Sequence, residues 1–122
     1  LDENTFPRVS ESSELMPEKS DSFFVRADRK MIKICYREIL FIESLSDYIK
    51  IHLIDKKVVT RETISSIEAK LPQNKFLRTH RSFVVSIDKI ESFTSEVVEI
   101  GEKQIPISRS YKNEVLQKLD SL

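Results

Sequence analysis

Short apolar segments recur along most of this chain, and each is bounded by polar or turn-forming residues. In the segment DYIKIHLID, Ile49, Ile51 and Leu53 lie on one side of an extended backbone, and the residues between them lie on the other. Further segments of this kind are FFVRADRKMIKICY, EILFIES, VVTR, SFVVSIDKIESF and EVVEIGEKQIPIS. Turns are predicted at 28–30, at 56–57 and at Gly101, the only glycine. The short, regular spacing predicts a mainly β domain.

Two segments have helical spacing. The first, TISSIEAKLP, places three apolar residues on one helical face, namely Ile64, Ile67 and Leu71. Within it, Ser65 and Glu68 fit a capping box. The second, SRSYKNEVLQKLDSL, places four residues on one stripe: Tyr111, Val115, Leu119 and Leu122. We expect Ser108 or Ser110 to be the N-cap of this last helix.

Charge divides the chain into two parts. Residues 1–22 carry two Lys or Arg against six Asp or Glu, a formal charge of −4, and are rich in Ser, Glu and Pro. Residues 23–122 carry 18 Lys or Arg against 14 Asp or Glu, a formal charge of +4. We therefore expect a flexible linker over 1–22 and one domain over 23–122. The single cysteine, together with the lack of a secretory signal or a long apolar run, predicts a cytoplasmic protein that does not enter a membrane.

The residue types needed for catalysis are scarce. His52 and His80 are the only imidazoles, and Cys35 lies in an apolar strand where it is expected to join the core. There is no nucleophile elbow, no Gly-rich phosphate loop and no zinc-binding pair of histidines. We therefore predict no enzyme activity, no cofactor and no metal site. A hydrolase or metalloenzyme would require Cys35 to meet one of the two histidines in a shared cleft.

Cations gather where apolar segments begin. Arg78, His80 and Arg81 stand together in FLRTHRSFVVS, directly before an apolar strand. Arg109 and Lys112 share one face at the start of the last helix. Cations are unfavourable there because the helix N-terminus carries partial positive charge, and a phosphate would relieve the repulsion. The alternative is that Arg109 and Lys112 are ordinary surface charges.

A third polar cluster lies in ESLSDYIK, which contains Asp47, Tyr48 and Lys50. Ser, Tyr and Lys at the tip of a loop are typical contacts to nucleic-acid phosphates. The same residues also fit a hairpin turn in which Ser and Asp satisfy backbone groups.

Three of these motifs occur in a specific order: ILFIESLSDYIKIH, FLRTHRSFVVSIDKIES and IPISRSYKNEVLQKL. Together they closely resemble the LytTR family, the DNA-binding output domain of many bacterial response regulators, over about residues 23–120. The resemblance implies a mainly β fold of about ten short strands in three small antiparallel sheets, with one or two short helices. It also implies that loops, rather than a recognition helix, enter two successive major grooves of DNA.

The resemblance assigns roles residue by residue. The implied base contacts are Tyr48 (or its neighbours Asp47 and Lys50), Arg81 and Arg109. The family often has a His near the first of these positions, where this chain has Tyr48. The implied phosphate-contacting or supporting residues are Asp47, Lys50, Arg78, His80 and Lys112. Among these, we expect His80 to pack against the loop and orient it.

The implied partner is duplex DNA carrying promoter repeats, bound to control transcription in a two-component system. The resemblance further implies an upstream phosphorylatable receiver domain, joined through residues 1–22. The low net charge predicts weak binding by the isolated domain, so we expect tight binding to need a dimer on DNA. The alternative from a different class is a β-rich protein-interaction or regulatory module that has lost DNA binding. The low net charge and Tyr48 in place of a His keep this alternative open.

Overall fold

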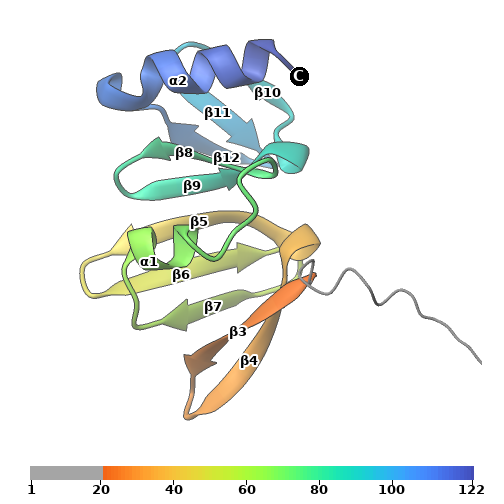
Figure 1. The fold of residues 1–122 in the computed structure, drawn as a ribbon, viewed down its shortest axis with the longest axis vertical. Coiled ribbons are helices and arrows are strands. Elements are labelled where there is room, and N and C mark those ends of the chain that lie inside the picture. The colour runs from red at the N-terminus through yellow and green to blue at the C-terminus, as the bar shows by residue number, and fades with distance from the viewer. Residues whose placement is uncertain (1–20) are drawn as a thin grey trace, which may run out of the picture.

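The structure is a computed structural model that describes residues 21–122. Ten strands and two α-helices make up most of this part of the chain, which confirms the mainly β prediction (Figure 1). The strands are β3 (Ser22–Ala27), β4 (Lys30–Cys35), β5 (Ile39–Leu45), β6 (Tyr48–Leu53), β7 (Lys57–Thr60), β8 (Phe76–His80), β9 (Phe83–Ser86), β10 (Ser92–Phe93), β11 (Val97–Ile100) and β12 (Lys103–Pro106). The helices are α1 (Ile64–Glu68) and α2 (Arg109–Asp120), with 3-10 turns η2 (Tyr36–Glu38) and η3 (Ile87–Lys89).

The strands form three antiparallel sheets. The largest has five strands in the order β7-β6-β5-β9-β8, the second has three in the order β10-β11-β12, and β3 pairs with β4 alone. The predicted turn at 28–30 and the turn at Gly101, where φ is +61°, are both present. The turn predicted at 56–57 lies slightly earlier, because Lys57 already pairs with His52 as part of β7.

The five-stranded sheet separates two hydrophobic cores. On one side, Ile42, Ile49 and Ile51 pack with α1 and with the β3–β4 hairpin. On the other side, Phe41, Leu77 and Val85 pack with α2 and with the three-stranded sheet. The predicted alternation is confirmed in β6, where Ile49, Ile51 and Leu53 are all buried. A sheet covered on both faces leaves its edges and turns as the exposed sites for function.

Helix α1 is shorter than its apolar spacing indicated, but its predicted face is correct. Ile64, Ile67 and Leu71 are all buried in the first core. The predicted capping box is wrong: the N-cap is Thr63, whose side chain accepts a hydrogen bond from the Ser66 amide at 3.1 Å. The Glu68 side chain does not cap the helix; it accepts a hydrogen bond from Arg78 instead.

Helix α2 packs over β8 and the three-stranded sheet, and forms the top layer in Figure 1. Val115 and Leu119 are buried and Tyr111 is half-buried, as the stripe predicted. Leu122 is an exception, because it lies beyond the helix and is 77% exposed. Ser108 is the N-cap position, although its hydroxyl makes no capping hydrogen bond. No helix within residues 21–122 is long and apolar enough to cross a bilayer.

Candidate nucleic-acid interface

Strand register brings the predicted site residues to one edge of the molecule. Glu43 pairs with Phe83, and the Ser44 amide donates to the Ser82 carbonyl at 2.8 Å, so the β5–β6 and β8–β9 turns lie side by side. The Ser108 amide donates to the Thr79 carbonyl at 2.9 Å, which places the start of α2 beside the end of β8. We call this edge, with residues 46–48, 81–82 and 108–109, the turn edge; it is on the left in Figure 1.

The β8–β9 turn carries Arg81 as an exposed side chain. The ladder shifts register between Arg78 and His80, just before the turn. His80 accepts a hydrogen bond from the Ser82 amide on its Nδ1 at 3.0 Å, and its ring meets the Phe83 ring edge to face at 5.7 Å. These contacts hold the turn, and within residues 21–122 the Arg81 side chain makes no hydrogen bond or ion pair.

Arg78 is fixed beneath the same turn. Its guanidinium donates to the Glu68 carboxylate at 2.6 Å, to the His80 carbonyl at 2.9 Å and to the Arg81 carbonyl at 2.7 Å. The Arg78 side chain is 15% exposed and lies over the Tyr111 ring at 5.7 Å. A charge held by three hydrogen bonds, one of them to a carboxylate, is suited to supporting the turn rather than to meeting DNA.

At the start of α2, Arg109 is exposed and Lys112 is partly exposed. Within residues 21–122 neither side chain forms an ion pair or a hydrogen bond. The positive end of the α2 dipole lies beside both. This arrangement disfavours further cations unless an anion binds, so it provides a local electrostatic reason for a phosphate here.

The β5–β6 turn is built differently. Ser46 has a positive φ of 59°, a conformation that bends the chain sharply, and Asp47 is exposed beside it. Tyr48 is 45% exposed at the start of β6. Lys50 is half-buried, opposite Glu43 on β5 and Val59 on β7.

One residue at this turn was missed from the sequence. The Arg61 guanidinium lies 5.7 Å from the centre of the Tyr48 ring, close enough for a cation–π contact. Arg61 follows β7, where Thr60 pairs with Ile49. The turn predicted at 56–57 implies that VVTR pairs with DYIKIH. Extending that pairing to Arg61 would have placed this residue near Tyr48.

The other reactive residue types lie away from the turn edge. His52 is buried, stacks on Phe41 at 4.1 Å, and lies 3.1 Å through Nε2 from the Glu43 carboxylate. Burial lowers the pKa of His52 below its ordinary value, and the Glu43 carboxylate offsets part of this effect. Cys35 ends β4 in the two-stranded sheet, whereas His52 and His80 belong to the five-stranded sheet. Within residues 21–122 no three His, Cys, Asp or Glu side chains gather as metal ligands would.

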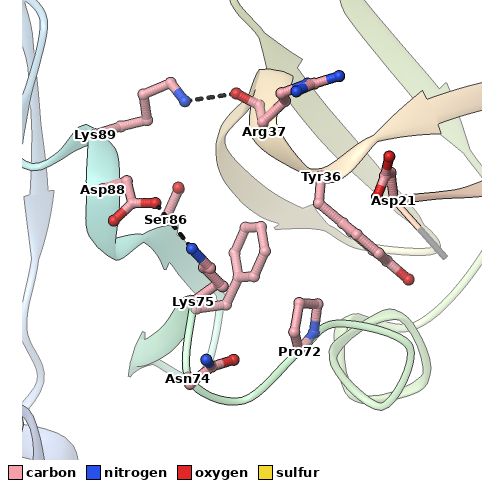
Figure 2. Close-up of a pocket in the computed structure, with 10 residues that line it drawn as sticks. Asp21, Tyr36, Arg37, Pro72, Asn74, Lys75, Ser86, Asp88 and Lys89 are labelled. Carbon is pink, nitrogen blue, oxygen red and sulfur yellow. Dashed lines mark hydrogen bonds and ion pairs between the residues drawn. The ribbon is translucent and has the colours of Figure 1, made fainter. Parts of the chain in front are cut away.

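A hollow of ≈ 440 Å³ lies at the opposite end of the five-stranded sheet, where β8 begins and β9 ends (Figure 2). Two of its cations are engaged: Lys75 pairs with Asp88 at 3.6 Å, and Lys89 donates to the Arg37 carbonyl at 2.5 Å. Arg37 itself is exposed, and its guanidinium makes no ion pair within residues 21–122.

Comparison with known proteins gives a consistent result. The family model described as "LytTr DNA-binding domain" matches residues 29–120. The sensory transduction protein LytT of Bacillus anthracis is 32% identical over 111 residues, which are 78% of this chain and 44% of that protein. The LytT protein of Enterococcus faecalis is 27% identical over 107 residues, 83% of this chain and 44% of that protein. The chain thus spans less than half the length of these relatives.

A solved structure shares the fold. It is titled "LytTr DNA-binding domain of putative methyl-accepting/DNA response regulator from Bacillus cereus". The two superpose with a TM-score of 0.70 at 17% sequence identity, covering 85% of this chain and 100% of that one. By sequence motif and by fold, this chain belongs to the LytTR family of DNA-binding domains.

Proposed function

We propose that this chain binds duplex DNA sequence-specifically through the turn edge and thereby controls transcription in the bacterial cytoplasm. The observation that carries the proposal is the convergence of Tyr48, Arg81 and Arg109 from three separate segments on one exposed edge. Arginine is suited to reading guanine in the major groove, since its planar fork pairs with two acceptors of the base. In this proposal Arg81 and Arg109 read bases, and Tyr48 or its neighbours Asp47 and Lys50 make the third base contact.

The width of the turn edge supports contact with more than one groove. Five strands lie in the sheet, and spacings of about 4.8 Å make their edge roughly 19 Å wide. Helix α2 adds a further layer beyond β8. A major groove is about 12 Å wide, so the whole edge does not fit within one. Contacts in two successive major grooves, as the family resemblance implies, suit these dimensions.

The supporting residues divide into two groups in this proposal. Lys50 and Lys112, which are partly exposed, contact phosphates on either side of the base-reading residues. Arg78 and His80 hold the β8–β9 turn in the conformation that presents Arg81. Phosphate contacts set position and salt dependence, and base contacts set sequence preference.

The upstream partner is part of the proposal. One relative is named a response regulatory protein and another a sensory transduction protein, and both are longer than this chain, which favours a receiver domain ahead of it. The domain's formal charge of only +4 favours a dimer, because two linked copies raise the effective concentration at paired sites. A forced dimer should bind a two-site duplex more tightly than the chain alone, and equal affinity would argue against this part.

Alanine substitution of the base-reading arginines tests the proposal. Arg81→Ala and Arg109→Ala should each weaken binding to a selected duplex by about 1–3 kcal/mol, roughly 5- to 150-fold, and relax preference at one base pair. Lys112→Ala should weaken binding to all sequences and reduce the salt slope by about one. Titrations by fluorescence anisotropy at several salt concentrations measure both quantities.

Arg37→Ala is the matched control, because Arg37 is exposed at the opposite end of the sheet. Its affinity for the duplex should equal that of the unaltered chain. If Arg81→Ala and Arg109→Ala bind as well as Arg37→Ala does, the assignment of the turn edge is wrong. Absence of any duplex binding would instead favour an interaction module.

A further inference from the structure

The cationic character of the turn edge continues past the β5–β6 turn. Arg61 leaves β7 beside Tyr48, and beyond it the tip of the β3–β4 hairpin carries Arg26, Arg29 and Lys30. All four side chains are exposed. We call these four residues the flanking cations.

The hairpin tip is fixed to the same edge. The Thr60 hydroxyl, at the end of β7, donates to the Arg26 carbonyl at 2.6 Å. Thr60 also pairs with Ile49, which follows Tyr48, so the end of β3 and the β5–β6 turn lie on the same side. In Figure 1 the tip of the β3–β4 hairpin lies on the left with the β5–β6 and β8–β9 turns. The flanking cations thus continue the turn edge away from Arg81 and Arg109.

At the tip, an arginine occupies a backbone conformation in which long side chains are uncommon. Asp28 and Arg29 both have positive φ, 53° and 64°. Gly, Asn and Asp ordinarily occupy such turn positions, because a larger side chain is strained there. A charged side chain held in this conformation projects from the end of a hairpin that is anchored to the sheet.

The charges at the tip are not neutralised by the protein itself. Among residues 21–122 none of the flanking cations forms an ion pair, and Arg61 contacts only the Tyr48 ring. Acids do lie on this edge, since Asp28 and Asp47 occupy the two turns. The cations still outnumber them, so a polyanion that follows the edge meets a net positive surface.

We propose that the flanking cations bind phosphates of the DNA backbone outside the base pairs read by Tyr48, Arg81 and Arg109. The inference rests on the proposed function and extends the bound segment on the side of the β5–β6 turn. Because these contacts are to phosphate, they add affinity and salt dependence without altering the sequence read.

The test is a tip variant, Arg29→Asn with Lys30→Gln, in the full 122-residue chain. Asn tolerates positive φ, so the variant removes two charges and retains the turn. On a long selected duplex, the slope of log K against log salt should fall in magnitude by about two, at about 0.9 per phosphate. The consensus selected from random duplexes should not change.

A matched control and a shortened duplex complete the test. Arg37→Gln with Lys103→Gln removes two exposed charges from the opposite end and should leave the slope unchanged. Trimming the duplex on the side of the tip should weaken the unaltered chain more than the tip variant, which retains only Arg26 and Arg61 of the flanking cations.

The two proposals fail in distinguishable ways. Suppose that the unaltered chain binds DNA and that Arg81→Ala weakens the binding. If the tip variant then has the same slope of log K against log salt as the unaltered chain, only the proposal for the flanking cations is wrong. If Arg81→Ala has no effect, the proposed function itself fails. A thermal melt of the tip variant close to that of the unaltered chain shows that any lost slope reflects lost charge rather than unfolding.

Discussion

The β8–β9 and β5–β6 turns lie side by side on the turn edge, yet they are held in different ways. Beneath the β8–β9 turn, the Arg78 guanidinium makes three hydrogen bonds and the His80 ring accepts a fourth from the backbone. The β5–β6 turn rests on one residue with positive φ, Ser46, and on the contact between Arg61 and Tyr48. The β8–β9 turn is thus held by side-chain hydrogen bonds, and the β5–β6 turn by strand pairing up to Leu45 and Tyr48 and by the ring contact.

This difference has a physical consequence for DNA reading. A bidentate contact to guanine requires the guanidinium to be placed within a fraction of an ångström, so a braced turn suits Arg81. An exposed aromatic residue on a less restrained turn can adjust to the base or sugar that it meets. Sequence preference is therefore expected to be sharper at the base pair opposite Arg81 than at the one opposite Tyr48.

Removing the Arg78 side chain should have the largest effect on the β8–β9 turn, in both stability and DNA affinity. Arg78→Met leaves Glu68 and two backbone carbonyls without their donor, which should lower the free energy of unfolding by about 2–3 kcal/mol. DNA affinity should fall as well, although Arg78 itself is not proposed to touch DNA. Urea denaturation and duplex titration measure the two effects separately.

Arg78→Lys is the informative companion. It keeps the positive charge near Glu68 and loses the planar fork that joins three acceptors, so it should lie between the unaltered chain and Arg78→Met. If Arg78→Met were as stable and bound as tightly as the unaltered chain, the β8–β9 turn would not depend on this network.

Two further substitutions, one in each turn, compare smaller losses of stability. His80→Ala removes the acceptor for the Ser82 amide and the packing on Phe83, and should cost about 1–2 kcal/mol of stability. Tyr48→Ala removes an exposed side chain and one cation–π contact, and should cost less than about 1 kcal/mol. Equal losses in thermal and urea denaturation would show that the two turns are held alike.

The smallest expected effect is a loss of stability in acid, which acts through His52 in β6. The pKa of His52 is lowered by burial, so the unfolded chain takes up a proton more readily than the folded one. Stability due to neutral His52 is therefore present above about pH 6.5, its ordinary pKa, and is lost as the pH falls below that value. His52→Gln should flatten the dependence of unfolding free energy on pH in this window. Identical pH dependence in the two proteins would contradict the assignment.

Much of the fold could be predicted from local pattern, because alternation and helical spacing report directly on burial. Ile49 and Ile51 in β6, and Ile64 and Ile67 in α1, are buried as expected. The order of strands in the sheet could not be predicted in this way, since pairing of β5 with β9 joins residues far apart in the chain. For the same reason the local pattern could not place the β3–β4 tip beside Arg61.

The incorrect details have two different physical causes, a tertiary partner in one case and the end of a helix in the other. Glu68 fits a capping box by spacing, but the Arg78 guanidinium provides a stronger partner than a helix terminus does. Leu122 continues the stripe of α2 by spacing, but the helix has ended before it. For the site, spacing showed where cations gather. The structure distinguishes the Arg78 side chain, which is engaged, from the Arg81 side chain, which is exposed and has no hydrogen bond or ion pair to the rest of residues 21–122.

Selection of binding sites from a random duplex pool tests the central claim most directly. The unaltered chain should enrich a short consensus, and Arg81→Ala should enrich the same consensus with preference lost at one base pair. A pool without enrichment, or an Arg81→Ala consensus identical at every position, would contradict the account in which the turn edge reads DNA.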